Sequence, residues 1–165
     1  MSEASQLESM LQGAEKESFD LVNVVSGCVD GYRLAYADKQ FSLETSDGPI
    51  ILIGLPDTFA QLLDKLVQNA IDFATAGTPI GISVSSTTNF VTLSVINEGP
   101  CLTPAVSASL FSSMVSSRIE GAETHLGLGL YIVRVIAEFH GGGVSAKNLP
   151  DKSGVQITVQ VPVAS

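Results

Sequence analysis

The sequence is short of the residues on which several classes of protein depend. Its 165 residues include no tryptophan, two cysteines, and eight lysines and arginines against 17 aspartates and glutamates. Cys28 and Cys101 are too few and too far apart for a disulfide framework, so a reducing compartment is expected. The formal net charge of −9 argues against nucleic-acid binding, which needs clustered basic residues. A small phosphorylated ligand remains possible, because backbone N–H groups and a cation can neutralise it.

Long apolar runs are also missing. No run approaches the roughly 20 residues that span a bilayer, and no signal peptide opens the chain. Hydrophobic residues still make up 45% of the sequence and charged residues only 15%, which excludes a disordered tail. We therefore expect one soluble domain with a substantial core and no direct membrane contact, which can belong to a longer membrane protein.

Hydrophobic periodicity predicts alternating helices and strand pairs. Pairs of strands between single helices favour an α/β (α+β) two-layer sandwich, with a mixed sheet and helices on one face. Residues 97–126 are mostly irregular, and so long a loop in a compact domain is typical of a lid or a binding loop. The expected helices cover residues 2–17, 19–37, 57–75, 105–111 and 127–140, and the expected strands cover residues 40–45, 50–53, 80–86, 91–96, 143–148 and 154–161.

Three polar residues share one face of the helix at residues 57–75. Lys65, Asn69 and Asp72 are spaced i, i+4 and i+7 beside a wide apolar stripe. A cation, an amide and a carboxylate so aligned can meet a phosphate and its Mg²⁺. A solvated helix face is the alternative, and it is the commoner meaning of this pattern taken alone.

The strand at residues 91–96 ends in an amide and a glycine-proline turn. Asn97 follows the strand, and Gly99 permits close approach of a backbone or a ligand. This arrangement suits a pocket at the strand end, although an ordinary exit into a loop has the same pattern.

Gly127 and Gly129 alternate with leucines directly before the last helix. Free backbone N–H groups and the positive end of the helix favour an anion there. The spacing matches neither the dinucleotide fingerprint nor a P-loop, and glycines also serve close helix packing.

In the preceding loop, Phe111, Met114 and Val115 can anchor the chain while Arg118 reaches a phosphate; a plain surface arginine is the alternative.

In this order, these four stretches resemble the ATP-binding domain of bacterial sensor histidine kinases, which has the Bergerat fold of gyrase-type ATPases and related chaperones. Asn69-Ala70 resembles the N box, residues 97–100 the first glycine box, residues 110–118 the F box and residues 127–130 the second glycine box. The resemblance covers about residues 19–162. Residues 113–116 and 125–130 are also similar to kinases that accompany dedicated sortase systems in proteobacteria.

The resemblance implies roles for individual residues. Asn69 would coordinate Mg²⁺, Phe73 would stack along the adenine, and Asn97 would accept a hydrogen bond from its amino group. Main-chain N–H groups of residues 126–130 would wrap the triphosphate. The catalytic residues so implied are Asn69, Lys65 and Arg118, and the residues that bind ATP and Mg²⁺ are Asn69, Asp72, Phe73, Asn97, Gly99, Leu102, Arg118, His125, Leu126, Gly127, Leu128, Gly129 and Leu130.

The resemblance also divides the chain. Residues 1–17 resemble the end of the dimerisation helix that carries the phosphoacceptor histidine, and residues 18–165 resemble the catalytic domain. Neither His125 nor His140 is that acceptor. The implied reaction is donation of the γ-phosphate to a histidine on a separate dimerisation segment of a two-component kinase. A response regulator would be a partner of the full-length protein. The domain would be the cytoplasmic part of an inner-membrane sensor kinase.

Several positions depart from the family pattern. Asn97 stands where the first glycine box usually begins with Asp, and Cys101 replaces its second glycine. Lys65 stands where kinases usually have Asn and the ATPase branches have a catalytic Glu, so activation of water is not expected. Asp72 stands where kinases usually have a base. Two alternatives stay open: a nucleotide-binding regulatory module with little or no phosphotransfer, and a serine-directed anti-sigma-factor kinase, which would not need the helical start.

Overall fold

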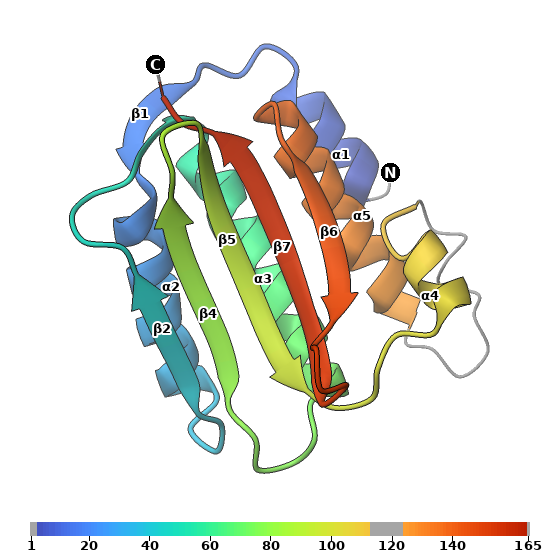
Figure 1. The fold of residues 1–165 in the computed structure, drawn as a ribbon. Coiled ribbons are helices and arrows are strands. Elements are labelled where there is room, and N and C mark those ends of the chain that lie inside the picture. Colours follow the sequence, from blue (N-terminus) through green and yellow to red (C-terminus); the bar gives the residue numbers. More distant parts are fainter. Residues whose placement is uncertain (1–2, 113–123, 165) are drawn as a thin grey trace.

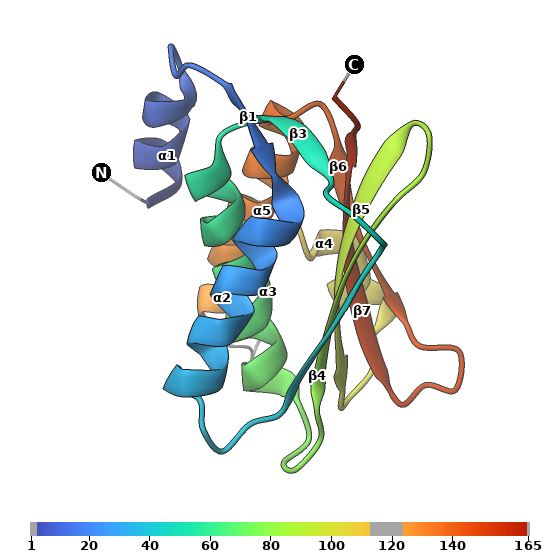
Figure 2. The same ribbon diagram turned by 90° about the vertical axis from the view of Figure 1, so that its left-hand side faces the viewer.

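Five strands form a mixed sheet, and helices cover one of its faces (Figures 1 and 2). This computed structural model describes residues 3–112 and 124–164, and the side chains of residues 5–112 and 129–164. The helices are α1 (Glu3–Leu11), α2 (Leu21–Ala35), α3 (Pro56–Phe73), α4 (Pro104–Ser109) and α5 (Thr124–Phe139), and the strands are β1 (Glu17–Asp20), β2 (Phe41–Thr45), β3 (Ile51–Gly54), β4 (Ile80–Ser86), β5 (Phe90–Glu98), β6 (Gly143–Asn148) and β7 (Gly154–Pro162).

The sheet has the strand order β2-β4-β5-β7-β6. β2 runs parallel to β4, and the other three neighbouring pairs are antiparallel. The predicted mixed sheet with helices on one face is therefore confirmed. β5 lies at the centre, and its C-terminal end lies beside the start of β7, because Glu98 pairs with Gly154.

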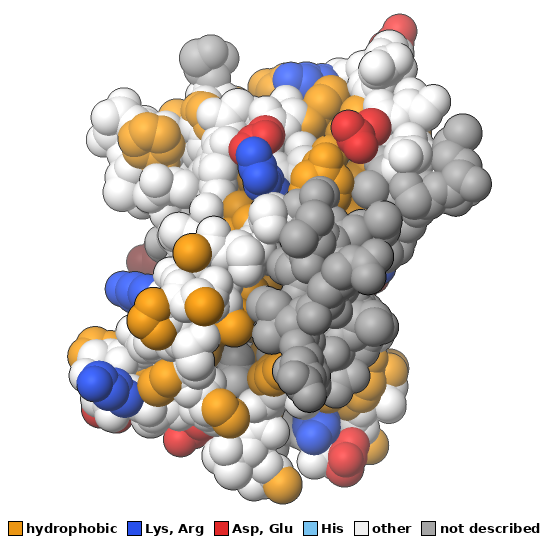
Figure 3. All heavy atoms as spheres, turned by 90° about the vertical axis from the view of Figure 1, so that its right-hand side faces the viewer, with side chains coloured by type: hydrophobic (Ala, Val, Ile, Leu, Met, Phe, Trp, Pro, Cys, Tyr) orange, Lys and Arg blue, Asp and Glu red, His pale blue; other side chains and the backbone are white. Residues whose placement is uncertain are grey.

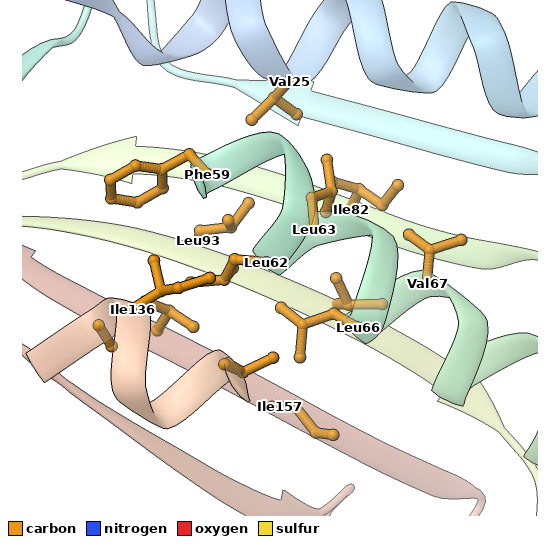
Figure 4. Packing of buried hydrophobic residues seen from close by; sticks show 14 of the residues in the cluster. Val25, Phe59, Leu62, Leu63, Leu66, Val67, Ile82, Leu93, Ile136 and Ile157 are labelled. Carbon is orange, nitrogen blue, oxygen red and sulfur yellow. The ribbon is translucent and has the colours of Figure 1, made fainter. Parts of the chain in front are cut away.

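The core lies between α3 and the inner face of the sheet (Figure 4). α3 contributes a continuous apolar stripe that includes Phe59, Leu62, Leu66 and Ala70, each no more than 2% exposed. Burial of the Phe and Leu side chains stabilises the fold by about 1.5–3 kcal/mol each. Side chains alternate between the two faces of β5, so Leu93 and Val95 point at this stripe. Asn97 is the next residue that points to the same inner face.

The strands at residues 40–45 and 50–53 exist as predicted, but they do not pair with each other. β2 joins the main sheet, whereas β3 pairs with β1, so that Asp20 lies opposite Ile51. β1 is extended where a helix was expected. Asp20 explains the boundary, because its carboxylate caps α2 through Val22 N–H at 3.0 Å and also accepts from Ile50 N–H at 3.0 Å.

The first helix is shorter than the predicted 2–17. α1 ends at Leu11, and Gly13 adopts a positive φ of 78°, the conformation that commonly follows a helix end. Leu7 and Leu11 are buried, and α1 packs against α5 (Figure 1). The assignment of residues 1–17 to a dimerisation helix stays a prediction.

The last helix begins earlier than predicted. α5 starts at Thr124, so the backbone of Gly127 and Gly129 is helical and does not form a turn before the helix. Glycine costs about 1 kcal/mol relative to alanine in a helix, and burial of the apolar residues from Leu130 onward outweighs that cost. In the part of the chain that the structure describes, no helix has the length and apolarity needed to cross a membrane.

Candidate nucleotide-binding site

Asn69 lies near the C-terminal end of α3, beside the buried stripe. Its Oδ1 is buried and has no hydrogen-bond partner among the described residues. A buried oxygen without a partner costs about 1–3 kcal/mol, and native proteins leave few such atoms. A ligand that reaches Oδ1 removes this cost, which makes Asn69 the strongest indication of a binding site.

The oxygen of Asn69 suits a hard cation, since Mg²⁺ prefers oxygen ligands. Within the described residues, no group of three or more His, Cys, Asp or Glu side chains lies together as a metal site would require. Mg²⁺ is commonly held by one or two protein oxygens together with phosphate oxygens and water. The site therefore fits Mg²⁺ that arrives with a nucleotide, and it does not fit a metal held by the protein alone.

A pocket of about 170 Å³ adjoins Asn69. Its walls are mostly apolar, and they come from α3, β5, the loop after β5, α4 and β7. Asn97, only 4% exposed, is a buried polar group in this lining, so it can fix the orientation of a flat apolar ligand. The lining residues are Asn69, Phe73, Asn97, Pro100, Cys101, Leu102, Thr103, Val106, Leu110, Val155 and Ile157.

Gly99 is required by the close approach of two elements. A Cβ at this position would overlap the carbonyl oxygen of Phe73. The contact is fixed by Thr75 N–H, which donates to Glu98 O at 2.8 Å. The end of α3 and the end of β5 are thereby held together, and Phe73 and Asn97 face one pocket.

Lys65 and the second glycine box meet between α3 and α5. A Cβ on Gly129 would lie 3.7 Å from Cδ of Lys65, an ordinary van der Waals distance, so the lysine side chain packs beside this glycine. On the face that carries α4, basic, acidic and apolar side chains of the described residues are intermixed (Figure 3). Lys65, beside Gly129, is a single cation of the kind that suits a phosphate.

The structure thus brings together Asn69, Phe73, Asn97 and Leu102 around one pocket and places Lys65 beside Gly129. Other predicted site residues stay predictions. Asp72 is exposed on α3. Leu130 is 1% exposed in the core, so its side chain cannot contact a nucleotide. Arg118 lies outside the described residues, as do the side chains of His125, Leu126 and Leu128; these three and Gly127 belong to α5 by their backbone.

Sequence reasoning missed part of the pocket wall. Val155 and Ile157 come from β7, which lies beside β5 only because of the strand order, and that order has no signature in the sequence. Val106 and Leu110 follow Thr103, whose side chain caps α4 by accepting from Val106 N–H at 3.2 Å. The Thr-Pro pair at the start of α4 is a helix-start signal that could have pointed to this wall.

Residues 54–165 match the family model described as histidine kinase-, DNA gyrase B- and HSP90-like ATPase. The chain belongs to this family. Sensor histidine kinase CssS of Bacillus subtilis is 28% identical over 152 residues, which are 92% of this chain and 32% of CssS. Sensor protein KdpD of Escherichia coli is 33% identical over 116 residues, which are 70% of this chain and 12% of KdpD. The chain therefore spans about a third or less of these relatives.

Solved structures agree with the family. The catalytic domain of histidine kinase ThkA superposes with a TM-score of 0.78 at 25% identity, covering 91% of this chain and 97% of that one. The predicted ATP-binding catalytic domain of the sensor histidine kinase type is confirmed by these relatives together. The similarity to the sortase-associated subgroup stays a prediction.

Proposed function

We propose that this domain binds Mg-ATP in the pocket beside Asn69 and donates the γ-phosphate to a histidine on a separate dimerisation segment of a two-component sensor kinase. The observation that carries the proposal is the buried Oδ1 of Asn69, which lacks a partner among the described residues and adjoins an apolar pocket with Asn97 in its wall. Apolar walls suit an adenine, and an unsatisfied oxygen suits the cation of its triphosphate.

The base end of the site rests on Phe73, Leu102 and Asn97, all of which line the pocket. Phe73 and Leu102 supply apolar contact to the faces of the base. The amide oxygen of Asn97 accepts from the exocyclic amino group of adenine, although without the charge assistance that a carboxylate would give. Asn97 therefore selects the base by orientation, while the apolar walls supply most of the affinity.

The phosphate end rests on Asn69, Lys65 and the start of α5. Asn69 would hold Mg²⁺ through Oδ1, and the cation would neutralise part of the charge of the phosphates. Lys65 lies beside Gly129 and supplies a cation for the phosphates. The phosphates would lie at the positive end of α5 and contact the N–H groups that are free in its first turn, where residues 126 and 127 of the predicted stretch 126–130 lie. Arg118, Asp72 and His125 would complete the proposed contacts.

The proposed chemistry is transfer and not hydrolysis. Lys65 cannot act as the general base that activates water, so the chain's contribution is to orient the γ-phosphate and to neutralise its charge. The acceptor histidine comes from the dimerisation segment, and a response regulator takes the phosphate onward through the full-length protein. We place the domain on the cytoplasmic side of an inner-membrane sensor kinase, as the sensor kinases among its relatives suggest.

The test is transphosphorylation of a separately supplied dimerisation segment by this chain with Mg-ATP. Asn69→Ala is expected to lower transfer at least a hundredfold, because it removes the proposed metal ligand, while the unfolding midpoint stays close to that of the wild type. Gln68→Ala is the matched control, since Gln68 is exposed on the same helix turn and should leave transfer unchanged. Absence of transfer by the wild type, with ATP bound, would overturn the proposal.

The alternative is a nucleotide-binding regulatory module with little or no transfer. Asn97 and Cys101 favour it, since both line the base pocket at positions where the family usually has Asp and Gly. That alternative predicts nucleotide binding without phosphorylation of the dimerisation segment, so the same assay separates the two functions.

A further inference from the structure

We propose that Asn148, the last residue of β6, is a positioning residue that sets the wall of the nucleotide pocket at Leu102. Its side chain pairs with the backbone of Leu102 as a peptide group would: Leu102 N–H donates to Oδ1 at 2.7 Å, and Nδ2 donates to Leu102 O at 3.1 Å. Leu102 is a lining residue of the pocket. The inference rests on the proposed function, in which this pocket holds the base of a nucleotide.

The β6–β7 hairpin is the template, in the sense of the hydrogen-bonded support, for residues 99–102, the segment that follows β5. Gly99 N–H donates to Ser153 O at 2.8 Å, and the Cys101 thiol donates to Lys152 O at 3.0 Å. Together with the two bonds of Asn148, four hydrogen bonds join residues 99–102 to this hairpin. The segment has left the sheet and cannot use ladder bonds, so its conformation depends on these partners.

An asparagine suits this position because its amide carries both a donor and an acceptor. It satisfies the two backbone groups of Leu102 directly before Thr103, the N-cap of α4. The pair therefore fixes the point at which the chain turns into α4, which supplies Val106 to the same pocket. Loss of the pair would free the wall at Leu102 while leaving the core between α3 and the sheet untouched.

The template is itself held firmly. Leu149 N–H donates to Gly154 O at 2.9 Å, and Lys152 N–H donates to Leu149 O at 2.8 Å. Lys152 adopts a φ of 60°, the left-handed region that side chains other than glycine rarely take. Asp151 accepts from Ser153 N–H at 3.1 Å and from its hydroxyl at 2.6 Å, which holds the pKa of Asp151 below its usual value. The hairpin is thus preorganised for the loop that it supports.

The experiment measures two quantities on this 165-residue chain: the Kd of Mg-ADP by calorimetry, and the hydrogen-exchange rate of the Leu102 amide by NMR. Asn148→Ala is expected to raise the Kd about tenfold, because two hydrogen bonds that order the wall are lost. Exchange at Leu102 should accelerate by a similar factor. The unfolding midpoint should change little, since Asn148 is exposed. Asn89→Ala, the same change in the β4–β5 turn, should leave both quantities unchanged.

A variant that keeps only one of the two hydrogen bonds distinguishes positioning of Leu102 by Asn148 from simple packing against it. Asn148→Asp keeps an acceptor for Leu102 N–H but replaces the donor by an oxygen that faces and repels Leu102 O. The exchange rate of Leu102 N–H should therefore lie between those of the wild type and Asn148→Ala, while the Kd rises above its wild-type value. A Kd of Asn148→Ala within twofold of the wild type, or an unchanged Leu102 exchange rate, would overturn the inference alone. Failure of the wild type to bind Mg-ADP at millimolar concentration would overturn the proposed function and this inference with it.

Discussion

The two ends of β5 are built in different ways. At its start, the β4–β5 turn is closed by its own residues: Thr87 N–H donates to Phe90 O at 2.8 Å, and the Thr87 hydroxyl accepts from Phe90 N–H at 3.1 Å. At its end, the chain takes its hydrogen-bond partners from Asn148 and from residues 152–153, about 50 positions later in the sequence. The candidate site lies at this end, where residues 99–102 are held by several distant partners.

This contrast shows how the pocket beside Asn69 and Asn97 arises at the C-terminal end of β5. The β4–β5 turn makes its closing hydrogen bonds among its own residues, and one further bond reaches it from Val163 N–H, which donates to Asn89 O at 3.0 Å. A segment that leaves the sheet must be held from outside, and the space between the segment, α3 and the hairpin becomes a pocket. Substitutions at the two ends should therefore have separable effects on nucleotide affinity and on stability.

The largest effect on stability is expected from Gly99→Ala, which changes the C-terminal end of β5. The new methyl group would overlap the Phe73 carbonyl, so α3 and β5 must move apart, at a cost of about 2–4 kcal/mol in the free energy of unfolding. Denaturant unfolding checks this value. Gly48→Ala is the control, because Gly48 also has a positive φ but has nothing within 4 Å of its Cβ position. Equal losses in the two variants would show that the close approach to Phe73 does not matter.

Thr87→Ala should give a smaller effect at the opposite end. It removes the hydroxyl that accepts from Phe90 N–H and donates to Phe90 O at 3.3 Å, which should cost about 1 kcal/mol of stability. The Kd of Mg-ADP should stay at its wild-type value, because Thr87 lies at the end of β5 opposite the pocket. A tenfold change in that Kd would break the proposed separation between the two ends.

His140 also has a distant partner, and it should make stability depend on pH. Its Nδ1–H donates to Ile136 O at 2.8 Å, and its Nε2 accepts from Leu55 N–H at 3.1 Å. Burial lowers the pKa of His140, and the nearby charge of Lys16 lowers it further, against an opposing effect of the Ile136 carbonyl. The unfolded chain then binds more protons below pH 6.5, so stability is complete above that pH and is lost as the pH falls toward the folded pKa.

The check is the denaturant midpoint between pH 7.5 and 5.5. The wild type and His125→Gln should lose stability over this range, and His140→Gln should lose the dependence. The same slope in His140→Gln as in the wild type would contradict the assignment.

The sequence predicted the parts whose signal is local. The apolar stripe of α3 with Asn69 beside it, the end of β5 at Asn97, and the mixed sheet followed from periodicity and turn residues, and the structure has them. The pairing of β1 with β3 was missed, because Asp20 gains its second partner, Ile50 N–H, only in the folded chain. Leu102 was assigned to the site, but its partner Asn148 was not found, since a bond across 46 positions leaves no pattern in either segment.

The central claim is that Asn69 and the adjoining pocket take a nucleotide together with its cation. Calorimetric titration of the chain with ADP, in the presence of Mg²⁺ and then of excess EDTA, tests this claim most directly. We predict binding that weakens at least tenfold without Mg²⁺ in the wild type, and no difference between the two conditions in Asn69→Ala. The same affinity in Mg²⁺ and in EDTA for the wild type, or an unchanged dependence on Mg²⁺ in Asn69→Ala, would contradict it.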